Sequence, residues 1–248
     1  MTVSLTAAVI RTLSWFGFEA RKIPRRGKFA IPDAGFYRPL FSPWYGYGEF
    51  AEYLKLAEPY TLVSPERLYI LFSLAKNAAR MQGDFWECGV YKGGTARMLA
   101  AFLRRNAGPG VRLHLFDTFG GMPPTDRGVD FHREGDFSDA SLEAVRCAVG
   151  DDERVEFHPG WIPESFRNLP ETPIAMAHVD VDIYRSVRDC CEFIYPRLQP
   201  GGVMVFDDYG FPTCPGARKA VDEFFAGKPE FPIVLGTGQA LVIRSAAG

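Results

Sequence analysis

The chain has 248 residues, of which 47% are hydrophobic and 23% are charged, and its net charge is −2 with a pI near 6.1. This length fits one large domain, or a core with a small addition. It is enough to bury a full hydrophobic core without disulfides or structural metal ions. The nearly balanced charge gives no sign of a nucleic-acid or anionic-membrane partner.

The cysteine and hydropathy patterns predict a cytoplasmic protein. The five cysteines show no CxxC spacing, which argues against a zinc site or a disulfide framework and for a reducing compartment. No apolar run reaches the roughly 20 residues of a membrane span. Residues 1–18 are apolar, but Arg11 interrupts them and no basic segment precedes them, so we do not expect a signal peptide. Cys190 and Cys191 lie in a helical pattern and are expected to be small buried apolar residues.

Residues 1–60 differ from the rest because they are rich in aromatic residues and proline, most densely over residues 36–47. Proline and glycine interrupt any regular strand or helix there. We predict an irregular N-terminal arm or lid over 1–60, and a subunit contact of a homo-oligomer fits the same composition. A loop that simply covers hydrophobic core is the alternative.

From residue 64 onward the pattern is regular. Ser64 suits an N-cap and Pro65 a first helical position, so a helix begins there. A strand over 84–90, a glycine turn over 91–95 and a helix over 96–103 follow. Further strands are predicted over 112–117, 155–158, 174–181 and 203–206, with helices over 141–149 and 187–198. Alternation of this kind predicts a parallel sheet with helices on both faces.

The C-terminal part breaks this alternation. Residues 231–235 and 239–243 are strand-like and flank Gly236-Thr237-Gly238, which predicts an antiparallel hairpin. A mostly parallel seven-stranded α/β sheet closed by such a hairpin resembles the Rossmann-like class I methyltransferase fold.

Two apolar strands end in carboxylates, over residues 178–184 (HVDVDIY) and 203–209 (VMVFDDY). In open α/β sheets, ligands bind at this carboxyl-end edge. The four acids are Asp180, Asp182, Asp207 and Asp208. They would repel one another unless a cation or a proton is shared among them. The pattern therefore predicts a metal-assisted active site.

The spacing of these acids divides their roles only in part. Asp180 and Asp182 point to the same side if the strand continues, so they are either a metal ligand and a base or two ligands. Asp207 and Asp208 both reach one ion only if the chain turns there, which Gly210 and Pro212 favour.

Residues 87–95 (ECGVYKGGT) form a glycine-rich segment directly after a strand. Glycines let the backbone approach a ligand, and the following helix presents free N–H groups. Asp117, at the end of the next strand, suits hydrogen bonding to ribose hydroxyls. The segment is neither GxGxxG nor a P-loop, so it indicates an adenosine-bearing cofactor other than a dinucleotide.

Five motifs together resemble the macrocin O-methyltransferase family: ECGVYKGGT, DTFGGMP, HVDVDIY, PGGVMVFDDYG and CPGARKAVDEFF. These are S-adenosylmethionine- and magnesium-dependent enzymes that methylate sugar hydroxyls of antibiotics. The resemblance covers roughly residue 60 to the C-terminus, and it implies a methyltransferase domain over residues 61–248.

The resemblance also implies roles for individual residues. It assigns Asp180, Asp207 and Asp208 as Mg²⁺ ligands and Asp182 as the general base. The residues that it places against S-adenosylmethionine are Thr61, Glu87, Gly89, Gly93, Gly94, Thr95, Asp117, Ser138 and Trp161. Val181 and Arg185 depart from the family pattern, which leaves the metal chemistry intact and puts the acceptor pocket in doubt.

Other functions fit the acidic motifs less well. A phosphatase of the haloacid-dehalogenase type needs a lysine between its acidic motifs, and none occurs between Asp182 and Asp207. A DxD glycosyltransferase would leave the glycine segment without a role. A non-enzymatic adapter would leave the four acids without one. We expect an acceptor with adjacent hydroxyls, either a sugar of a metabolite or glycan, or a catechol-like diol.

Two histidines lie near these motifs. His178 precedes the acids inside an apolar strand, so we predict a packed, hydrogen-bonded core residue. His132 lies in the polar insertion 120–136, which is long enough to form a substrate lid, and we predict that its side chain is exposed to solvent.

Overall fold

The structure is a computed structural model that describes residues 42–167, 169 and 171–246. Residues 42–60 lie within the segment that we predicted as an arm. They form the short 3₁₀ helix η1 (Pro43–Tyr45), the helix α2 (Phe50–Ala57) and η2 (Glu58–Tyr60). The rest of the predicted arm, residues 1–41, lies outside the described residues.

A seven-stranded sheet runs through the described residues in the order β3-β2-β1-β4-β5-β7-β6. Its strands are β1 (Asp84–Cys88), β2 (Leu113–Asp117), β3 (Val155–Pro159), β4 (Ile174–Val179), β5 (Leu198–Phe206), β6 (Ile233–Val234) and β7 (Ala240–Ile243). The first five pair in parallel, whereas β7 runs antiparallel to both β5 and β6. The predicted parallel sheet with a terminal antiparallel hairpin is confirmed.

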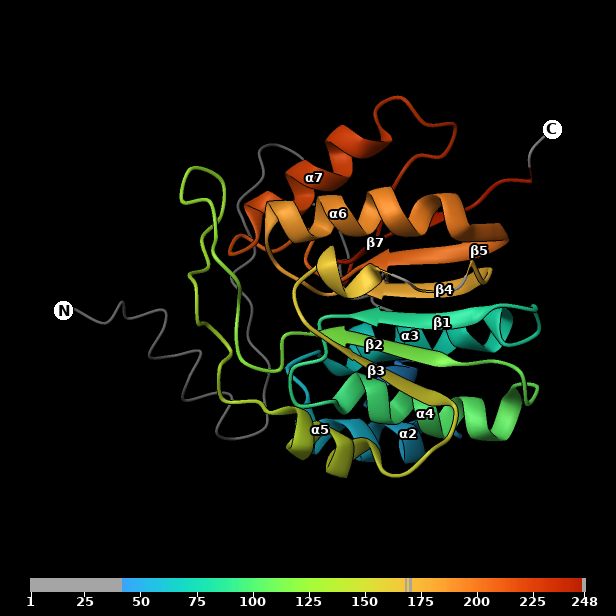
Figure 1. Ribbon diagram of the computed structural model, residues 1–248. Helices are drawn as coiled ribbons and strands as arrows, with labels where there is room; N and C mark the ends of the chain where they lie inside the picture. The colour runs from blue at the N-terminus through green and yellow to red at the C-terminus, as the bar shows by residue number, and fades with distance from the viewer. Residues whose placement is uncertain (1–41, 168, 170, 247–248) are drawn as a thin grey trace, which may run out of the picture. The chain divides into compact units, whose positions relative to one another are not determined.

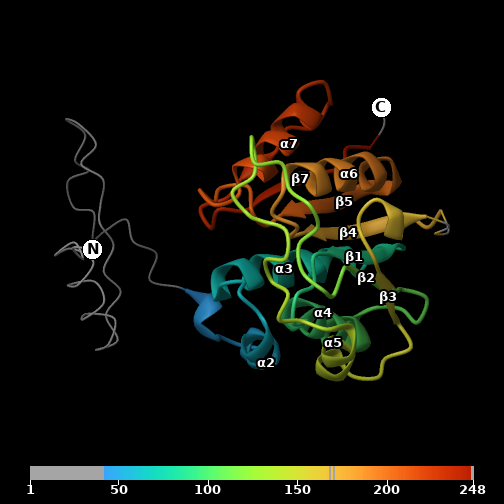
Figure 2. The same ribbon diagram turned by 60° about the vertical axis from the view of Figure 1, so that its left-hand side comes forward.

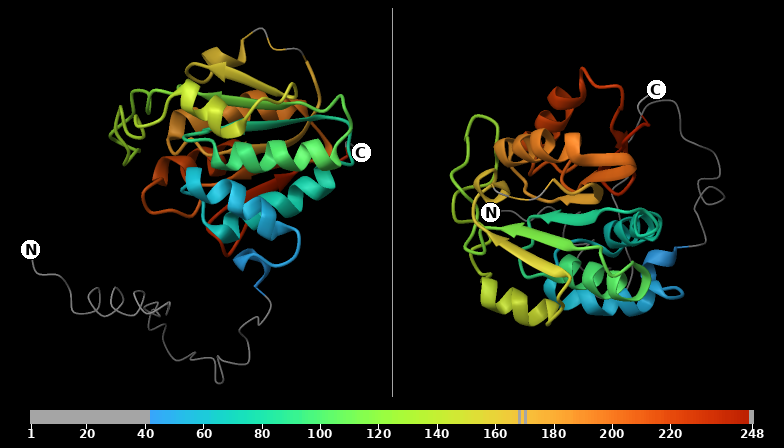
Figure 3. Two further views of the ribbon diagram at one scale, coloured as in Figure 1. Left: turned by 90° about the horizontal axis from the view of Figure 1, so that it is seen from below. Right: turned by 45° about the vertical axis from the view of Figure 1, so that its right-hand side comes forward.

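Helices cover both faces of the sheet (Figures 1 and 2). The helices are α3 (Pro65–Ala78), α4 (Gly94–Asn106), α5 (Leu142–Val149), α6 (Tyr184–Ile194) and α7 (Pro215–Phe225), with short η3 (Glu164–Phe166) and η4 (Tyr195–Arg197). Helices α2 to α5 share one hydrophobic core with one face of the sheet, and α6 and α7 share the other. Figure 3 shows α2 beside α4 in the first of these layers.

The aromatic residues of α2 belong to the core. Phe50 and Tyr53 are buried, and their rings lie 5.3 Å and 5.1 Å from the ring of Phe72 on α3. Tyr53 also contacts Phe102 on α4, with 5.9 Å between ring centroids. Burial of such large rings is a strong source of stability, so α2 is held by the helices next to it.

Two predicted element boundaries are wrong near the acids. Strand β4 ends at Val179, not at residue 181, and α6 begins at Tyr184, not at residue 187. Asp182 has a left-handed φ of 58°, which no strand residue adopts. Strand alternation therefore does not place Asp180 and Asp182 on one side. The loop after β4 sets the directions of their side chains.

Several smaller expectations hold. All five cysteines lie within the described residues and are free thiols, and Cys190 and Cys191 are fully buried. Among the described helices, none has both the length and the apolar character that crossing a membrane requires.

Close packing of α4 against the α2–α3 connection depends on Gly94. A Cβ at Gly94 would lie 2.5 Å from the Cβ of Thr61 and 2.7 Å from the carbonyl oxygen of Ala57. We expect Gly94→Ala to lower the free energy of unfolding by about 1–3 kcal/mol because backbone must move to admit the methyl group.

Gly108→Ala is the matched control, because a Cβ there meets nothing within 4 Å. Its free energy of unfolding should stay within about 0.5 kcal/mol of the wild type. Equal denaturant midpoints for the two variants would contradict the packing role of Gly94.

Candidate active site

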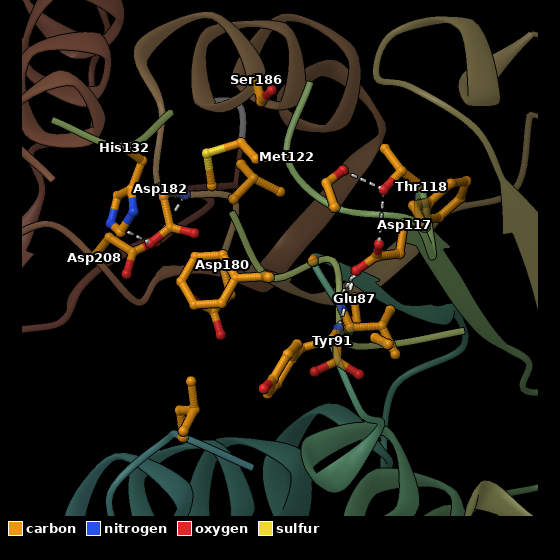
Figure 4. A pocket seen from close by; sticks show the side chains of 18 of the residues that line it. Glu87, Tyr91, Asp117, Thr118, Met122, His132, Asp180, Asp182, Ser186 and Asp208 are labelled. Atoms are coloured by element: carbon orange, nitrogen blue, oxygen red, sulfur yellow. Dashed lines mark hydrogen bonds and ion pairs between the residues drawn. The ribbon is translucent and has the colours of Figure 1, made fainter. Parts of the chain in front are cut away.

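A cavity of about 280 Å³ opens at the carboxyl ends of β1, β2 and β4. The residues that line it include Thr61, Arg67, Glu87, Gly89, Val90, Tyr91, Thr95, Asp117, Thr118, Met122, His132, Phe137, Ala140, Trp161, Asp180, Asp182, Asp208 and Cys214. Figure 4 shows Glu87, Tyr91 and Asp117 in one group and Asp182, Asp208 and His132 in another. The cavity thus has two chemically different halves.

The first half is organised by the carboxylate of Asp117. Its Oδ2 accepts the backbone N–H groups of Val90 at 2.6 Å and Tyr91 at 3.0 Å, and its Oδ1 accepts that of Phe119 at 2.7 Å. The acid at the end of β2 therefore fixes the loop that follows β1. Tyr91 has a left-handed φ of 51° in this loop.

Gly89 brings two strand ends together. Its φ is +87°, and a Cβ there would lie 1.8 Å from the carbonyl oxygen of Asp180. Gly93 and Gly94 are not among the described residues that line the cavity, and added Cβ atoms would meet Val145 and Thr61 instead. Of these three glycines, Gly89 lies at the cavity and the other two serve helix packing.

Glu87 supplies a buried acceptor to this half. Its Oε1 lies 3.2 Å from His178 Nδ1, and its Oε2 has no hydrogen-bond partner among the described residues. Burial raises the pKa of Glu87. An unsatisfied buried carboxylate oxygen is costly, and a cationic or hydrogen-bonding ligand group would satisfy it.

Three of the other predicted cofactor residues line the cavity and one does not. Thr61, Thr95 and Trp161 line it, and the Trp161 side chain is exposed. Ser138 is missing from the described residues that form the wall, although its neighbours Phe137 and Ala140 belong to it.

The second half gathers carboxylates. Asp180, Asp182 and Asp208 line the cavity, and Asp208 Oδ2 accepts the backbone N–H of Asp182 at 3.0 Å. Burial, followed by the charge of Asp207, raises the pKa of Asp180 well above its usual range. Burial, followed by the charges of Asp182 and Asp180, does the same for the pKa of Asp208. Positive charge is therefore favoured here.

Asp207 differs from these three because donors surround it. Its Oδ1 accepts from Gln239 Nε2 at 2.8 Å and lies 3.3 Å from His178 Nε2, and its Oδ2 accepts from the Arg67 guanidinium. Burial opposes ionisation, but these donors lower the pKa of Asp207. The chain turns over 207–210, as predicted, but the turn does not bring both acids into the cavity wall, because Asp208 lines it and Asp207 does not.

The prediction that His132 is exposed is wrong. Its side chain is only 18% exposed, and its Nε2 lies 3.6 Å from Asp182 Oδ1 and 3.7 Å from Cys214 Sγ. The loop 118–140 carries it to the cavity (Figure 1). Asp130 anchors this loop, because its Oδ1 accepts the first N–H of α6, from Tyr184, at 2.8 Å.

The sequence pattern did not predict that two further residues, Arg67 and Cys214, contact the acids. The Cys214 thiol lies 3.3 Å from Asp182 Oδ1, and burial raises the pKa of this thiol. Arg67, on α3, reaches Asp207 from the opposite layer. Arg67 belongs to none of the five motifs, and Cys214 opens the motif CPGARKAVDEFF without a predicted role, so only the fold brings α3 and the start of α7 to the acids.

The profile of the macrocin-O-methyltransferase (TylF) family matches residues 56–229, well over half of the chain. The chain belongs to this family. Its fold is accordingly the class I O-methyltransferase fold.

Three characterised relatives have similar sequences. An 8-demethyl-8-(2,3-dimethoxy-α-L-rhamnosyl)-tetracenomycin-C 4′-O-methyltransferase of Streptomyces olivaceus is 33% identical over 57% of this chain, and the match spans 58% of its own length. A demethyldecarbamoylnovobiocin O-methyltransferase of Streptomyces niveus is 29% identical, over 68% of this chain and 69% of that protein. A mycinamicin III 3″-O-methyltransferase of Micromonospora griseorubida is 29% identical, over 66% and 70%.

Solved structures agree on the fold. The O-methyltransferase NovP is 26% identical, with a TM-score of 0.68 over 75% of this chain and 83% of NovP. The calicheamicin methyltransferase CalS11 covers 98% of this chain with a TM-score of 0.63 and aligns over 94% of its own length, and at 19% identity it shows the fold alone.

His178 ties the two halves together. It is fully buried, as predicted, between Glu87 Oε1 and Asp207 Oδ1. Burial alone would lower the pKa of His178, but hydrogen bonds to Asp207 and Glu87 raise it well above its usual range. The imidazolium is therefore a buried counter-charge to two acids.

We expect His178→Ala to lower the free energy of unfolding by about 3–5 kcal/mol, because it leaves two buried carboxylates without their counter-charge. Because the folded-state pKa of His178 is raised, its stabilisation is complete below pH 6.5 and fades as pH rises through the folded-state value. Denaturant titrations at several pH values measure this. If His178→Ala and the wild type had the same free energy of unfolding at pH 6, His178 would not be the counter-charge of the two acids.

Proposed function

We propose that the protein transfers the methyl group of S-adenosylmethionine to a sugar hydroxyl of a glycosylated small molecule, with Mg²⁺ and a carboxylate base. The observation that carries this proposal is the composition of the cavity. One half offers a fixed loop and an unsatisfied Glu87 oxygen, and the other gathers three carboxylates with raised pKa values.

The first half suits the cofactor. The Glu87 Oε2 atom is the acceptor that the methionine ammonium group needs, because a buried charge is stable only when it is paired. Asp117 holds the loop beside it and presents its carboxylate to the cavity for the ribose hydroxyls. Thr61, Thr95 and Trp161 supply further contacts along this half. Ser138 would reach the cofactor only through a movement of its loop.

The second half fits Mg²⁺, which takes hard oxygen ligands in octahedral geometry. Asp180 and Asp208 offer carboxylate oxygens to the cavity, and Asp207 adds a third once Arg67 leaves its Oδ2. The Arg67 guanidinium already places a positive charge beside Asp207, where a bound cation would also place one. Bound Mg²⁺ would polarise an acceptor hydroxyl and lower its pKa.

Asp182 is the residue that we propose as the general base. Burial raises the pKa of Asp182, while the His132 imidazole and the Cys214 thiol act in the opposite direction and stabilise the carboxylate. Asp182 Oδ1 takes the hydroxyl proton, and His132 Nε2 lies 3.6 Å from this oxygen.

The relatives support a sugar acceptor. The names of the Streptomyces olivaceus and Micromonospora griseorubida enzymes specify methylation at the 4′ and 3″ oxygens. None of the three names given above specifies a catechol-like diol or glycosyl transfer. We further propose that the enzyme works in the cytoplasm, in keeping with five free thiols, and as a homo-oligomer.

Asp182→Asn keeps the size of the side chain and removes the base. We expect methyl transfer to a rhamnosylated aromatic polyketide to fall about 10²–10⁴-fold at saturating Mg²⁺, with the affinity for S-adenosylmethionine unchanged. Product formation is followed by mass spectrometry and cofactor binding by calorimetry. Asp189→Asn, on α6 outside the cavity wall, is the control. A near-wild-type rate for Asp182→Asn would remove it as the base.

His132→Ala should shift the acidic limb of the rate profile to higher pH. The imidazole lowers the pKa of Asp182, so its removal raises that pKa and delays formation of the active carboxylate as pH rises. His132→Gln, which keeps a polar group without a charge, should shift the limb in the same direction. An unmoved limb in both variants would show that the imidazole does not act on the base.

A further inference from the structure

A second cluster of ligating side chains lies on β2 and β3, outside the cavity. Register pairs His114 with Glu156 and Phe116 with His158. Because side chains alternate along a strand, Glu156 and His158 lie on one face of β3, beside His114. Strand β3 is the first in the sheet order, so the cluster sits at a sheet edge. None of the three residues lines the cavity.

The donor atoms converge within one ion's reach. His114 Nδ1 lies 3.0 Å from His158 Nε2 and 3.6 Å from Glu156 Oε2, and one donor atom from each residue falls within 4.8 Å of the other two. Tetrahedral zinc with bonds of about 2.0–2.1 Å separates its ligand atoms by about 3.4 Å. The observed separations lie on either side of that value.

Asp84 fixes the orientation of His114. Asp84 Oδ1 accepts the backbone N–H of Arg112 at 2.8 Å, and Asp84 Oδ2 lies 3.3 Å from His114 Nε2. Burial works against ionisation, but the bonds from His114 and Arg112 lower the pKa of Asp84. A hydrogen bond from His114 Nε2 to the Asp84 carboxylate would leave the Nδ1 lone pair directed at His158. This carboxylate–histidine arrangement is the one that orients histidine ligands of zinc.

His158 is set up as a neutral donor. Burial and the neighbouring His114 lower the pKa of His158 to about 4. Its ring stacks on Phe116, with centroids 4.5 Å apart and an interplanar angle of 14°, which restricts its rotation. Glu156, whose side chain is 47% exposed, leaves the cluster open to ions from solvent.

We propose that His114 Nδ1, His158 Nε2 and a carboxylate oxygen of Glu156 bind Zn²⁺, with Asp84 orienting His114 and water in the fourth position. Two histidines and a glutamate form a known zinc donor set. The cysteine pattern gave no reason to expect zinc, and this donor set contains no cysteine. Zinc would join β2 and β3, the first two strands in the sheet order, and β3 leads directly to Gly160 and Trp161 of the cavity wall.

The test is a calorimetric titration of the untagged full chain with Zn²⁺ in excess Mg²⁺, repeated in Asp180→Asn/Asp208→Asn so that the cavity acids do not contribute. We expect one Zn²⁺ per chain in both proteins. Glu156→Gln and His158→Ala should each weaken this binding at least 100-fold. Asp84→Asn should weaken it about 10- to 100-fold, as loss of a partner behind a ligand does.

Glu153→Gln, at an exposed residue that precedes β3, is the matched control and should bind as the wild type does. Co²⁺ provides a second readout, because tetrahedral histidine and carboxylate ligation gives an intense visible spectrum that His158→Ala should abolish. Three results would overturn the site. The first is a zinc affinity that is only millimolar, and the second is the loss of zinc binding in Asp180→Asn/Asp208→Asn. The third is zinc binding that survives in both Glu156→Gln and His158→Ala. These results are independent of whether the protein transfers a methyl group.

Discussion

A buried imidazolium between two carboxylates is the interaction on which the site depends. His178, on β4, bridges Glu87 at the end of β1 and Asp207 just after β5, so it fixes the carboxyl ends of three adjacent strands. Each group would be costly to bury alone, and together they are paired. The bridge leaves Glu87 Oε2 free toward the cofactor half and keeps Asp207 ionised beside the cavity acids.

Charge divides the cavity into the two halves to which we assign the cofactor and the cation. In the cofactor half, the Asp117 carboxylate accepts three backbone N–H groups and gives the loop a fixed shape. In the other half, burial and then the charges of neighbouring carboxylates raise the pKa values of Asp180 and Asp208, which favours a cation. His132 and Cys214 surround Asp182 and distinguish it from the proposed ligands. One sheet edge thereby holds the half that we propose for the cation beside the half that we propose for the cofactor.

Much of this could be predicted from the sequence because the signals are local. Hydrophobic alternation predicts the parallel sheet and its hairpin, and the acid-ended strands predict where Asp180 and Asp208 meet. What could not be predicted depends on long-range packing. The left-handed turn at Asp182 breaks the strand pattern, and the Asp130 anchor that brings His132 into the cavity joins residues 54 positions apart. Arg67, on α3, and Cys214, directly before α7, contact acids to which the sequence pattern gave no link.

The central claim is that cofactor and cation occupy separate halves of one cavity. Paired titrations of the wild type and Asp180→Asn/Asp208→Asn test it most directly, with calorimetry for S-adenosylmethionine and electron paramagnetic resonance for Mn²⁺ in place of Mg²⁺. We expect equal cofactor affinity in the two proteins and Mn²⁺ binding that is lost in the variant. Cofactor affinity that collapses in the variant, or Mn²⁺ binding that is unchanged, would contradict it.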